Sequence, residues 1–196
     1  MNVKRTVRGY AQAGMAGIML EDQVAPKRCG HTKGKSIVSR EEAFQRIQAA
    51  VDARTEGQFD LVIMARTDAR ATHGLEEAIA RCQEFVRLGA DITFLEAPQS
   101  EAEMREYCDR VPGFKMANML DNGLTPILPQ EELEKMGFRI AAYPFTMLDS
   151  SIHAMKQALV DLDQQTEEGT RATFSEIQHA VGFPEYYNEE ARYSLK

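Results

Sequence analysis

Five short apolar runs, each separated from the next by a longer amphipathic segment, constrain the fold of this chain more than any other feature. The runs lie at residues 16–20, 61–65, 92–95, 115–117 and 140–143. Helix-prone segments follow them at 40–53, 75–88, 101–111, 129–136 and 146–165. In the second helical segment, apolar side chains recur at three- and four-residue spacing, as on one buried face of a helix. Such alternation predicts a parallel α/β sheet, either a closed barrel or a doubly wound open sheet.

Polar residues at the end of every apolar run favour the barrel. In order along the chain they are Glu21 with Asp22, Arg66 to Asp68, Glu96, Asn118, and Tyr143 with Pro144. In a (β/α)₈ TIM barrel the carboxyl ends of all strands form one functional face. A doubly wound sheet places its ligand at one switch point, so it does not need polar groups after every strand. No glycine-rich phosphate loop of Rossmann or P-loop spacing occurs.

The number of runs is too small for a whole barrel. The chain has 196 residues and opens with a helical pattern carrying Val3, Val7 and Tyr10 on one face, whereas a (β/α)₈ barrel takes about 250 residues. We therefore expect the first three βα units to be absent from this chain. A five-strand arc has two unprotected edges, so we expect either a fragment or a partner that supplies the rest.

Two regions follow from this interpretation. Residues 1–166 are expected to form a partial barrel with about strands 4 to 8, and residues 167–196 a C-terminal helical tail. The tail carries apolar and aromatic residues, including Phe183, Tyr186 and Tyr187. Because such a cluster favours burial, we expect the tail to dock on the barrel or on another subunit.

Charge and cysteine content limit the partners. A net charge of -7 argues against nonspecific nucleic-acid binding but not against a small anionic substrate. No apolar run is long enough to span a bilayer, and residues 1–13 do not read as a signal peptide. The three cysteines are widely spaced, which suggests reduced thiols in a cytoplasmic compartment.

The segment after the first apolar run carries the densest chemistry. It contains Glu21-Asp22-Gln23, then Lys27-Arg28-Cys29-Gly30-His31, then Gly34-Lys35. Paired carboxylates at a strand end suit Mg²⁺, directly or through water. Cations beside Cys29 favour a reactive thiol, and the loop has the length and glycines of a closing lid. The alternatives are an ordinary loop thiol, and a zinc site for which Cys29 and His31 supply too few ligands.

This signature resembles that of the isocitrate lyase / phosphoenolpyruvate mutase superfamily, in particular its methylisocitrate lyase and dimethylmalate lyase-like branch. Further matches follow in the same order, at residues 64–69, Leu95-Glu96-Ala97, Ala117-Asn118-Met119 and Thr125-Pro126. The resemblance covers essentially the whole chain. It implies the barrel fold, a swapped C-terminal helix as in many members, and a homo-oligomer, either a dimer or a tetramer.

The resemblance also implies roles for individual residues. Glu21 would hold Mg²⁺, with Mn²⁺ as the alternative, mostly through water. Cys29 would be the acid that protonates the departing enolate, and Gly30 and His31 would contact substrate. Arg66 would bind the substrate carboxylate or the developing oxyanion. Glu96 and Asn118 would be further polar residues that bind substrate, and Cys29, Arg66 and Glu96 would be the catalytic residues. The aspartates that bind the metal directly in the family are not in this sequence.

The implied reaction is Mg²⁺-dependent cleavage of a C–C bond in a 2-hydroxy acid, 2-alkylmalate-like or methylisocitrate-like, to a 2-oxo acid and a carboxylate. The chain would thus be a carbon–carbon (oxo-acid) lyase, although this part alone is expected to turn over little. Asp149 stands where methylisocitrate lyases place an arginine, and residues 120–123 also differ, which disfavours a tricarboxylate. The alternatives are a carboxyphosphoenolpyruvate-type phosphonomutase and a truncated non-catalytic paralogue.

Structural explanations compete with these roles. Arg66 would instead pair with Asp68 or Glu96, Glu96 would be a solvated loop charge, and Asn118 would form a turn. Asp22 is expected to support the loop rather than to bind metal.

Overall fold

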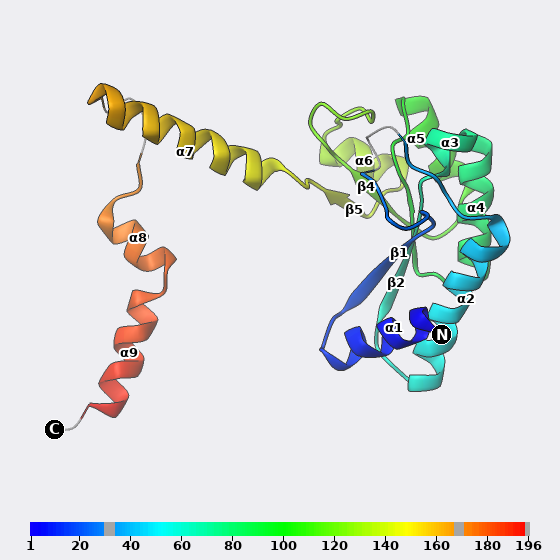
Figure 1. The fold of residues 1–196 in the computed structure, drawn as a ribbon, viewed down its shortest axis with the longest axis horizontal. Coiled ribbons are helices and arrows are strands. Elements are labelled where there is room, and N and C mark those ends of the chain that lie inside the picture. Colours follow the sequence, from blue (N-terminus) through cyan, green and yellow to red (C-terminus); the bar gives the residue numbers. More distant parts are fainter. Residues whose placement is uncertain (30–33, 167–170, 195–196) are drawn as a thin grey trace. The chain divides into compact units, whose positions relative to one another are not determined.

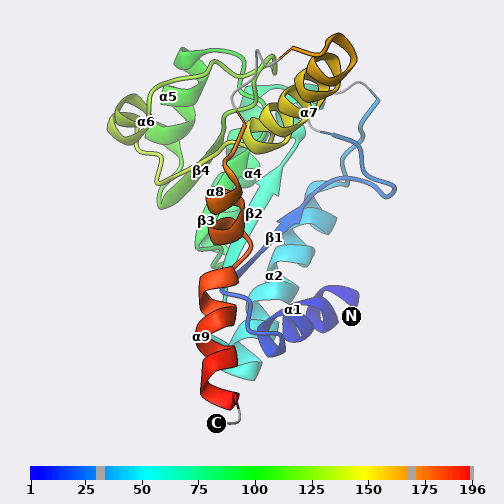
Figure 2. The ribbon, with the colours of Figure 1, turned by 90° about the vertical axis from the view of Figure 1, so that its left-hand side faces the viewer.

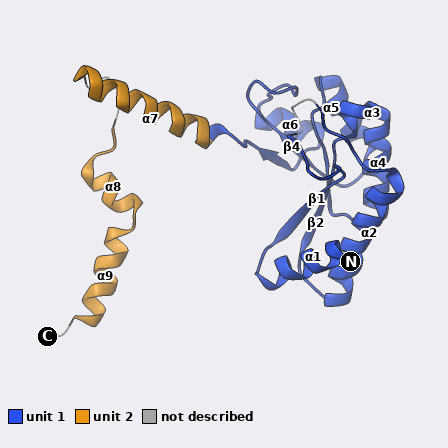
Figure 3. Cartoon of the chain, in the orientation of Figure 1, with its two compact units in different colours: residues 1–146 blue, residues 147–196 orange. Residues whose placement is uncertain are grey.

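The computed structural model describes residues 1–29, 34–166 and 171–194 (Figure 1). The chain divides into two compact units, Met1–Thr146 and Met147–Lys196 (Figure 3). The elements of the first unit are α1 (Asn2–Gln12), β1 (Gly17–Glu21), α2 (Arg40–Gly57), β2 (Val62–Thr67), α3 (Ala69–His73), α4 (Leu75–Arg87), β3 (Ile92–Leu95), α5 (Glu101–Arg110), β4 (Phe114–Asn118), α6 (Gln130–Met136) and β5 (Ile140–Ala142). The expected division at residue 166 stays a prediction.

The strand order confirms a barrel arc. All five strands are parallel, and their spatial order, β1-β2-β3-β4-β5, is their order in the sequence. A doubly wound sheet reverses its order at a switch point, and this sheet does not. The sequential order is that of consecutive strands in a (β/α)₈ barrel.

One face of the sheet is buried under helices. Helix α2 packs against β1 and β2, and α4 packs against β2 and β3 (Figure 2). Ile63, Ala65 and Thr67 of β2 point to this side and are fully buried. Their contacts fix the sheet face, because successive side chains of a strand point to opposite faces.

The opposite face of the sheet is apolar and exposed. Met19, Val62, Phe114 and Ile140 lie on it, with exposed fractions of 43%, 41%, 59% and 39%. In a complete barrel the side chains of this face fill the interior. The exposure therefore agrees with an arc rather than a closed barrel among the described residues.

Local signals set the ends of the helices. The Ser39 and Ser100 side chains accept hydrogen bonds from the backbone N–H groups of Glu42 and Glu103, which caps α2 and α5. Gly137 ends α6 in the left-handed conformation, at φ 111°, a region that favours glycine. Strand β5 then begins at Ile140.

The second unit is helical. It contains α7 (Thr146–Gln164), α8 (Phe174–Ala180) and α9 (Phe183–Tyr193). A capping box begins α8, with Thr173 and Glu176 bonded reciprocally. Phe183, Tyr186 and Tyr187 form a ring cluster in α9. Among the described residues, no helix has the length and apolar character needed to cross a membrane.

Candidate active site

Four of the predicted site residues meet at one end of the sheet. Glu21 on β1 is in register with Arg66 on β2. Glu96 directly follows β3, its backbone N–H bonded to the Thr67 carbonyl, and Asn118 ends β4. Side chains an even number of positions apart on a strand point to the same face. Each of the four residues is separated by an even number of positions from an apolar residue on the uncovered face, so all four point to that face. They therefore lie together at the carboxyl ends of the strands, the end that forms the active-site face in (β/α)₈ barrels.

Arg66 is the centre of this group. Its Nε and Nη2 atoms donate to the Asp68 carboxylate at 2.9 and 3.0 Å. Its Nε lies 3.4 Å from the Glu21 carboxylate, and its Nη2 lies 3.6 Å from Glu96. The guanidinium also covers the Phe94 ring, 5.1 Å from its centroid. The structural pairing with Asp68 is thus present, together with two further carboxylates on the open face.

These contacts keep Arg66 charged. Burial acts to lower the pKa of the guanidinium, but the hydrogen bonds to Asp68 and the negative charge of Glu96 outweigh it and raise that pKa. A fixed cation at the strand ends is the group that a substrate carboxylate or a developing oxyanion requires.

Glu96 and Asn118 form a pair beside Arg66. The Asn118 amide Nδ2 donates to Glu96 at 3.4 Å. Glu96 is 2% exposed, so the interpretation of this residue as a solvated loop charge is wrong. The backbone turns sharply at the next residue, because Ala97 has a positive φ of 56°. Both side chains can supply hydrogen bonds to a bound oxyacid.

The loop after β1 is anchored at its base. Gln23 and Ile37 form an antiparallel bridge, and the Val24 N–H donates to the Ser36 carbonyl at 2.9 Å. The Gln23 amide binds the backbone of Arg28 twice, as donor to its carbonyl at 2.9 Å and as acceptor from its N–H at 2.8 Å. Cys29, the next residue, is exposed. Gln23 therefore holds the backbone that presents the thiol.

Two other loop residues have contacts that matter. The Lys27 ammonium lies 3.1 Å from the Glu21 carboxylate, so this cation faces the strand end. Gly34 has φ +82°, and a Cβ there would lie 2.7 Å from the Arg28 guanidinium, so only glycine fits without a shift. Gly30 and His31, both predicted to contact substrate, lie outside the described residues.

Asp22 supports the site from beneath. Its carboxylate is buried and accepts hydrogen bonds from the Thr67 hydroxyl at 2.6 Å and the Asp68 N–H at 2.9 Å. Arg81 of α4 donates to it at 3.0 Å. Sequence reasoning expected the supporting role of Asp22 but missed Arg81. The sequence feature that could have revealed Arg81 is its position on the buried face of an amphipathic helix, beside Ala78 and Cys82.

The fit of a divalent cation rests on Glu21. Carboxylate oxygen is the donor type that Mg²⁺ prefers. Across the described ranges, no group of three or more His, Cys, Asp or Glu side chains could hold a metal. Glu21, already facing Lys27 and Arg66, suits a contact through metal-bound water rather than a complete site.

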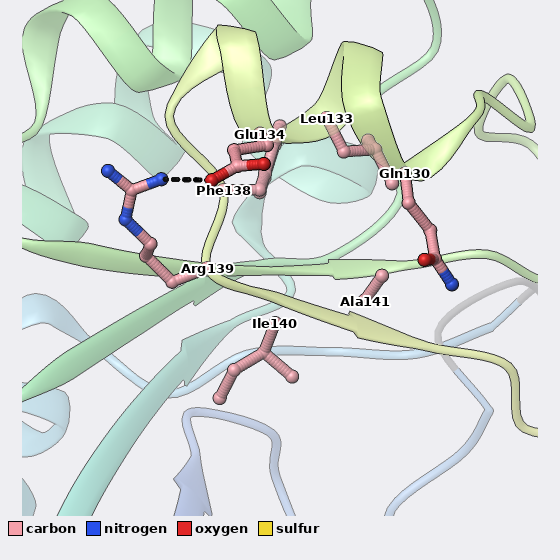
Figure 4. Close-up of a pocket in the computed structure, with 7 residues that line it drawn as sticks. All are labelled: Gln130, Leu133, Glu134, Phe138, Arg139, Ile140 and Ala141. Carbon is pink, nitrogen blue, oxygen red and sulfur yellow. Dashed lines mark ion pairs between the residues drawn. The ribbon is translucent and has the colours of Figure 1, made fainter.

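A separate hollow lies beside β5 and α6 (Figure 4). It has a volume of about 380 Å³, and an Arg139–Glu134 ion pair of 3.9 Å lies at its rim. Its lining residues are Gln130, Leu133, Glu134, Phe138, Arg139, Ile140 and Ala141. None of them is a predicted site residue, so this hollow is distinct from the strand-end group.

Comparison with known proteins identifies the family. The model of the family described as phosphoenolpyruvate phosphomutase matches residues 1–162. The chain belongs to the phosphoenolpyruvate phosphomutase family. This membership confirms the resemblance on which the assignment of Glu21, Cys29 and Arg66 rests, while their roles stay predictions.

Relatives in the phosphoenolpyruvate phosphomutase family include several activities. The chain is 44% identical to a 2,3-dimethylmalate lyase of Eubacterium barkeri over 99% of this chain and 68% of the relative. It is 40% identical to a chloroplastic carboxyvinyl-carboxyphosphonate phosphorylmutase of Arabidopsis thaliana, over 99% of this chain and 59% of the relative. A solved oxaloacetate acetylhydrolase, in complex with 3,3-difluorooxalacetate, superposes with a TM-score of 0.90 at 35% identity, covering 99% of this chain and 66% of that one. The chain thus spans about three fifths to two thirds of these relatives.

Proposed function

We propose that the chain is the part of a Mg²⁺-dependent carbon–carbon lyase that contains about strands 4 to 8 of the barrel and the active-site residues at their ends. The substrate would be a 2-hydroxy acid of the 2-alkylmalate type, split into a 2-oxo acid and a carboxylate. The observation that carries the proposal is the gathering of Glu21, Arg66, Glu96 and Asn118 on one face at the ends of four adjacent strands. The identity to a 2,3-dimethylmalate lyase supports it.

The chemistry assigns each side chain a task. The 2-hydroxyl gives up its proton to solvent and becomes the 2-oxo group as the C2–C3 bond breaks, and the bonding electrons pass to an enolate-like carbon next to a carboxylate. Arg66 binds this carboxylate and its growing negative charge, and Glu96 with Asn118 orients the oxygen atoms around it. Cys29 donates the proton to the carbon that departs, after the loop brings the thiol over the strand ends.

Mg²⁺, with Mn²⁺ as an alternative, would polarise the 2-oxo acid oxygens when bound. Glu21 would hold a water of this metal, because it is the strand-end carboxylate at the edge of the sheet. We expect the protein to be cytoplasmic, where the Cys29 thiol stays reduced, and to form a homo-oligomer. We also propose that the tail, residues 167–196, contributes to that assembly.

The test is release of 2-oxo acid from 2,3-dimethylmalate, 2-methylisocitrate and oxaloacetate, with Mg²⁺ and with EDTA. It is run on this chain and on a chimera in which the three N-terminal βα units of a dimethylmalate lyase precede residue 1. We expect Mg²⁺-dependent release from 2,3-dimethylmalate by the chimera, and little by the chain alone. Absence of release by both, from all three acids, would contradict the lyase proposal.

The role of Cys29 is tested in the same chimera. We expect Cys29→Ser to keep the fold and to lower turnover by a factor on the order of 10² or more, as for the loss of a general acid. Cys108→Ser is the matched control, because Cys108 is a half-buried cysteine remote in sequence from the loop. Near-normal turnover by the Cys29 variant would remove the thiol from the mechanism.

The second candidate is a carboxyphosphoenolpyruvate-type phosphonomutase. The 40% identity to a carboxyvinyl-carboxyphosphonate phosphorylmutase favours it, and both reactions need a cation for an anionic substrate. Formation of a P–C bond by the chimera, observed by ³¹P NMR without 2-oxo acid release from the three lyase substrates, would replace the lyase proposal.

A further inference from the structure

A buried ion pair beneath the strand ends has no part in the proposed chemistry. Arg81 of α4 and Asp22, which follows β1, have side-chain exposures of 3% and 1%, and Arg81 Nη1 lies 3.0 Å from Asp22 Oδ2. Neither side chain reaches the uncovered face of the sheet as Arg66 does. Replacement of a buried pair by apolar side chains is often neutral for stability, so stability alone does not explain this pair.

Arg81 also binds the far stem of the Cys29 loop. Its Nη2 donates to the Val38 carbonyl at 3.0 Å, and its Nε donates to Glu77 at 2.8 Å. The Val38 N–H in turn donates to the backbone carbonyl of Asp22 at 2.8 Å. One guanidinium therefore joins the end of β1 to the residue where the loop returns.

Asp22 passes the same constraint to Arg66. Its Oδ1 accepts from the Asp68 N–H, while its Oδ2 accepts from both the Thr67 hydroxyl and Arg81. Asp68 holds Arg66 through two hydrogen bonds. The orientation of the Arg66 guanidinium thus depends on a carboxylate that Arg81 fixes.

We propose that Arg81 is a positioning residue that sets the Arg66 guanidinium through Asp22 and the stem of the Cys29 loop through its own bond to Val38. The proposal rests on the proposed function, because that function assigns the catalytic roles of Arg66 and Cys29. Arg81 touches no substrate. It acts by making the end of β1, the end of β2 and the loop stem one hydrogen-bonded unit.

The test is hydrogen exchange of single amides in the 196-residue chain carrying Arg81→Met. We expect exchange at Asp68 and Val38 to accelerate at least tenfold. Exchange at Asp91, whose N–H binds the Ile63 carbonyl at the opposite end of β2 and β3, should stay within twofold. Arg87→Met is the matched control: Arg87 lies on the same helix, pairs with Glu84 and is exposed, so both amides should keep their protection.

A second variant separates positioning from stability. Arg81→Met leaves a buried Asp22 charge and risks unfolding, whereas the double variant D22N, R81M leaves none. We expect the double variant to have a higher urea midpoint than Arg81→Met alone, because it leaves no unpaired Asp22 charge, and still to show faster exchange at Asp68 and Val38. Equal acceleration at Asp91, or acceleration at neither or only one of the two reporter amides, would overturn the proposal. The exchange readout needs no turnover, so its outcome is distinguished from the outcome of the lyase assay.

Discussion

At the scale of single residues, burial separates the three cysteines. Burial raises the pKa of Cys108 to about 11 and that of Cys82 still further, and Cys82 is fully buried. The thiolate is the nucleophile, so both should react slowly at pH 8. We expect iodoacetamide to label exposed Cys29 at least about tenfold faster than Cys108. Peptide mass spectrometry of the labelled chain measures this, and equal rates would contradict the packing around α4 and α5.

Glu77 gives the molecule an acid-sensitive anchor. Hydrogen bonds from Arg40, and then from Arg81, lower the pKa of Glu77 from 4.5 to about 2 although burial opposes them. A carboxyl whose pKa is lower in the folded state than in the unfolded state stabilises the fold at pH values above its unfolded pKa. This stabilisation is lost as the pH falls towards the folded pKa. We expect about 1 to 2 kcal/mol to disappear between pH 4.5 and pH 2, less than the full shift because solvent reaches the side chain.

Urea unfolding at several pH values measures this anchor. Glu77→Gln should flatten the acid limb of the stability profile, whereas Glu134→Gln, with one exposed ion pair of 3.9 Å, should not. An unchanged acid limb in Glu77→Gln would show that other carboxylates cause the loss.

At the scale of elements, capping is the most direct prediction. The Ser100 hydroxyl accepts from the Glu103 N–H at 3.2 Å and begins α5. Ser100→Ala leaves that N–H without its acceptor and should lower the free energy of unfolding by about 1 kcal/mol, whereas Ser100→Gly should lower it by a few tenths. Urea unfolding of both variants tests this; a glycine variant less stable than the alanine variant would contradict the capping explanation.

The sequence predicted elements better than it predicted their connections. Apolar periodicity located all five strands and their parallel sense, because short β-branched runs and amphipathic segments have different periods. Polar residues at the strand ends predicted the placement of Arg66, Glu96 and Asn118. The short helix α3 was missed, since five residues carry too little periodicity. The Arg81–Asp22 contact spans 59 residues, and no local pattern encodes a pair so distant.

At the scale of the whole molecule, the long helix of the second unit exposes many large apolar side chains. Met147, Leu148, Ile152, Met155, Leu159, Val160 and Leu162 are all exposed. They come from one helix, α7. Exposed apolar side chains gathered on one helix are typical of interaction sites, and an amphipathic helix is a common docking element. We infer that α7 contributes to a subunit interface, in agreement with the proposed homo-oligomer.

Sedimentation velocity tests this inference. We expect the 196-residue chain to sediment as a dimer or a larger oligomer. We expect residues 1–146 alone to form an assembly with fewer subunits. Leu148→Asp with Leu159→Asp should act like the truncation, because burying two new carboxylates in an apolar interface is unfavourable. Lys156→Ala, an exposed change on the same helix, should leave the sedimentation coefficient unchanged. A monomeric full chain, or equal assembly after both changes, would contradict a role for α7, and the exposed sheet face that bears Phe114 would become the surface to explain.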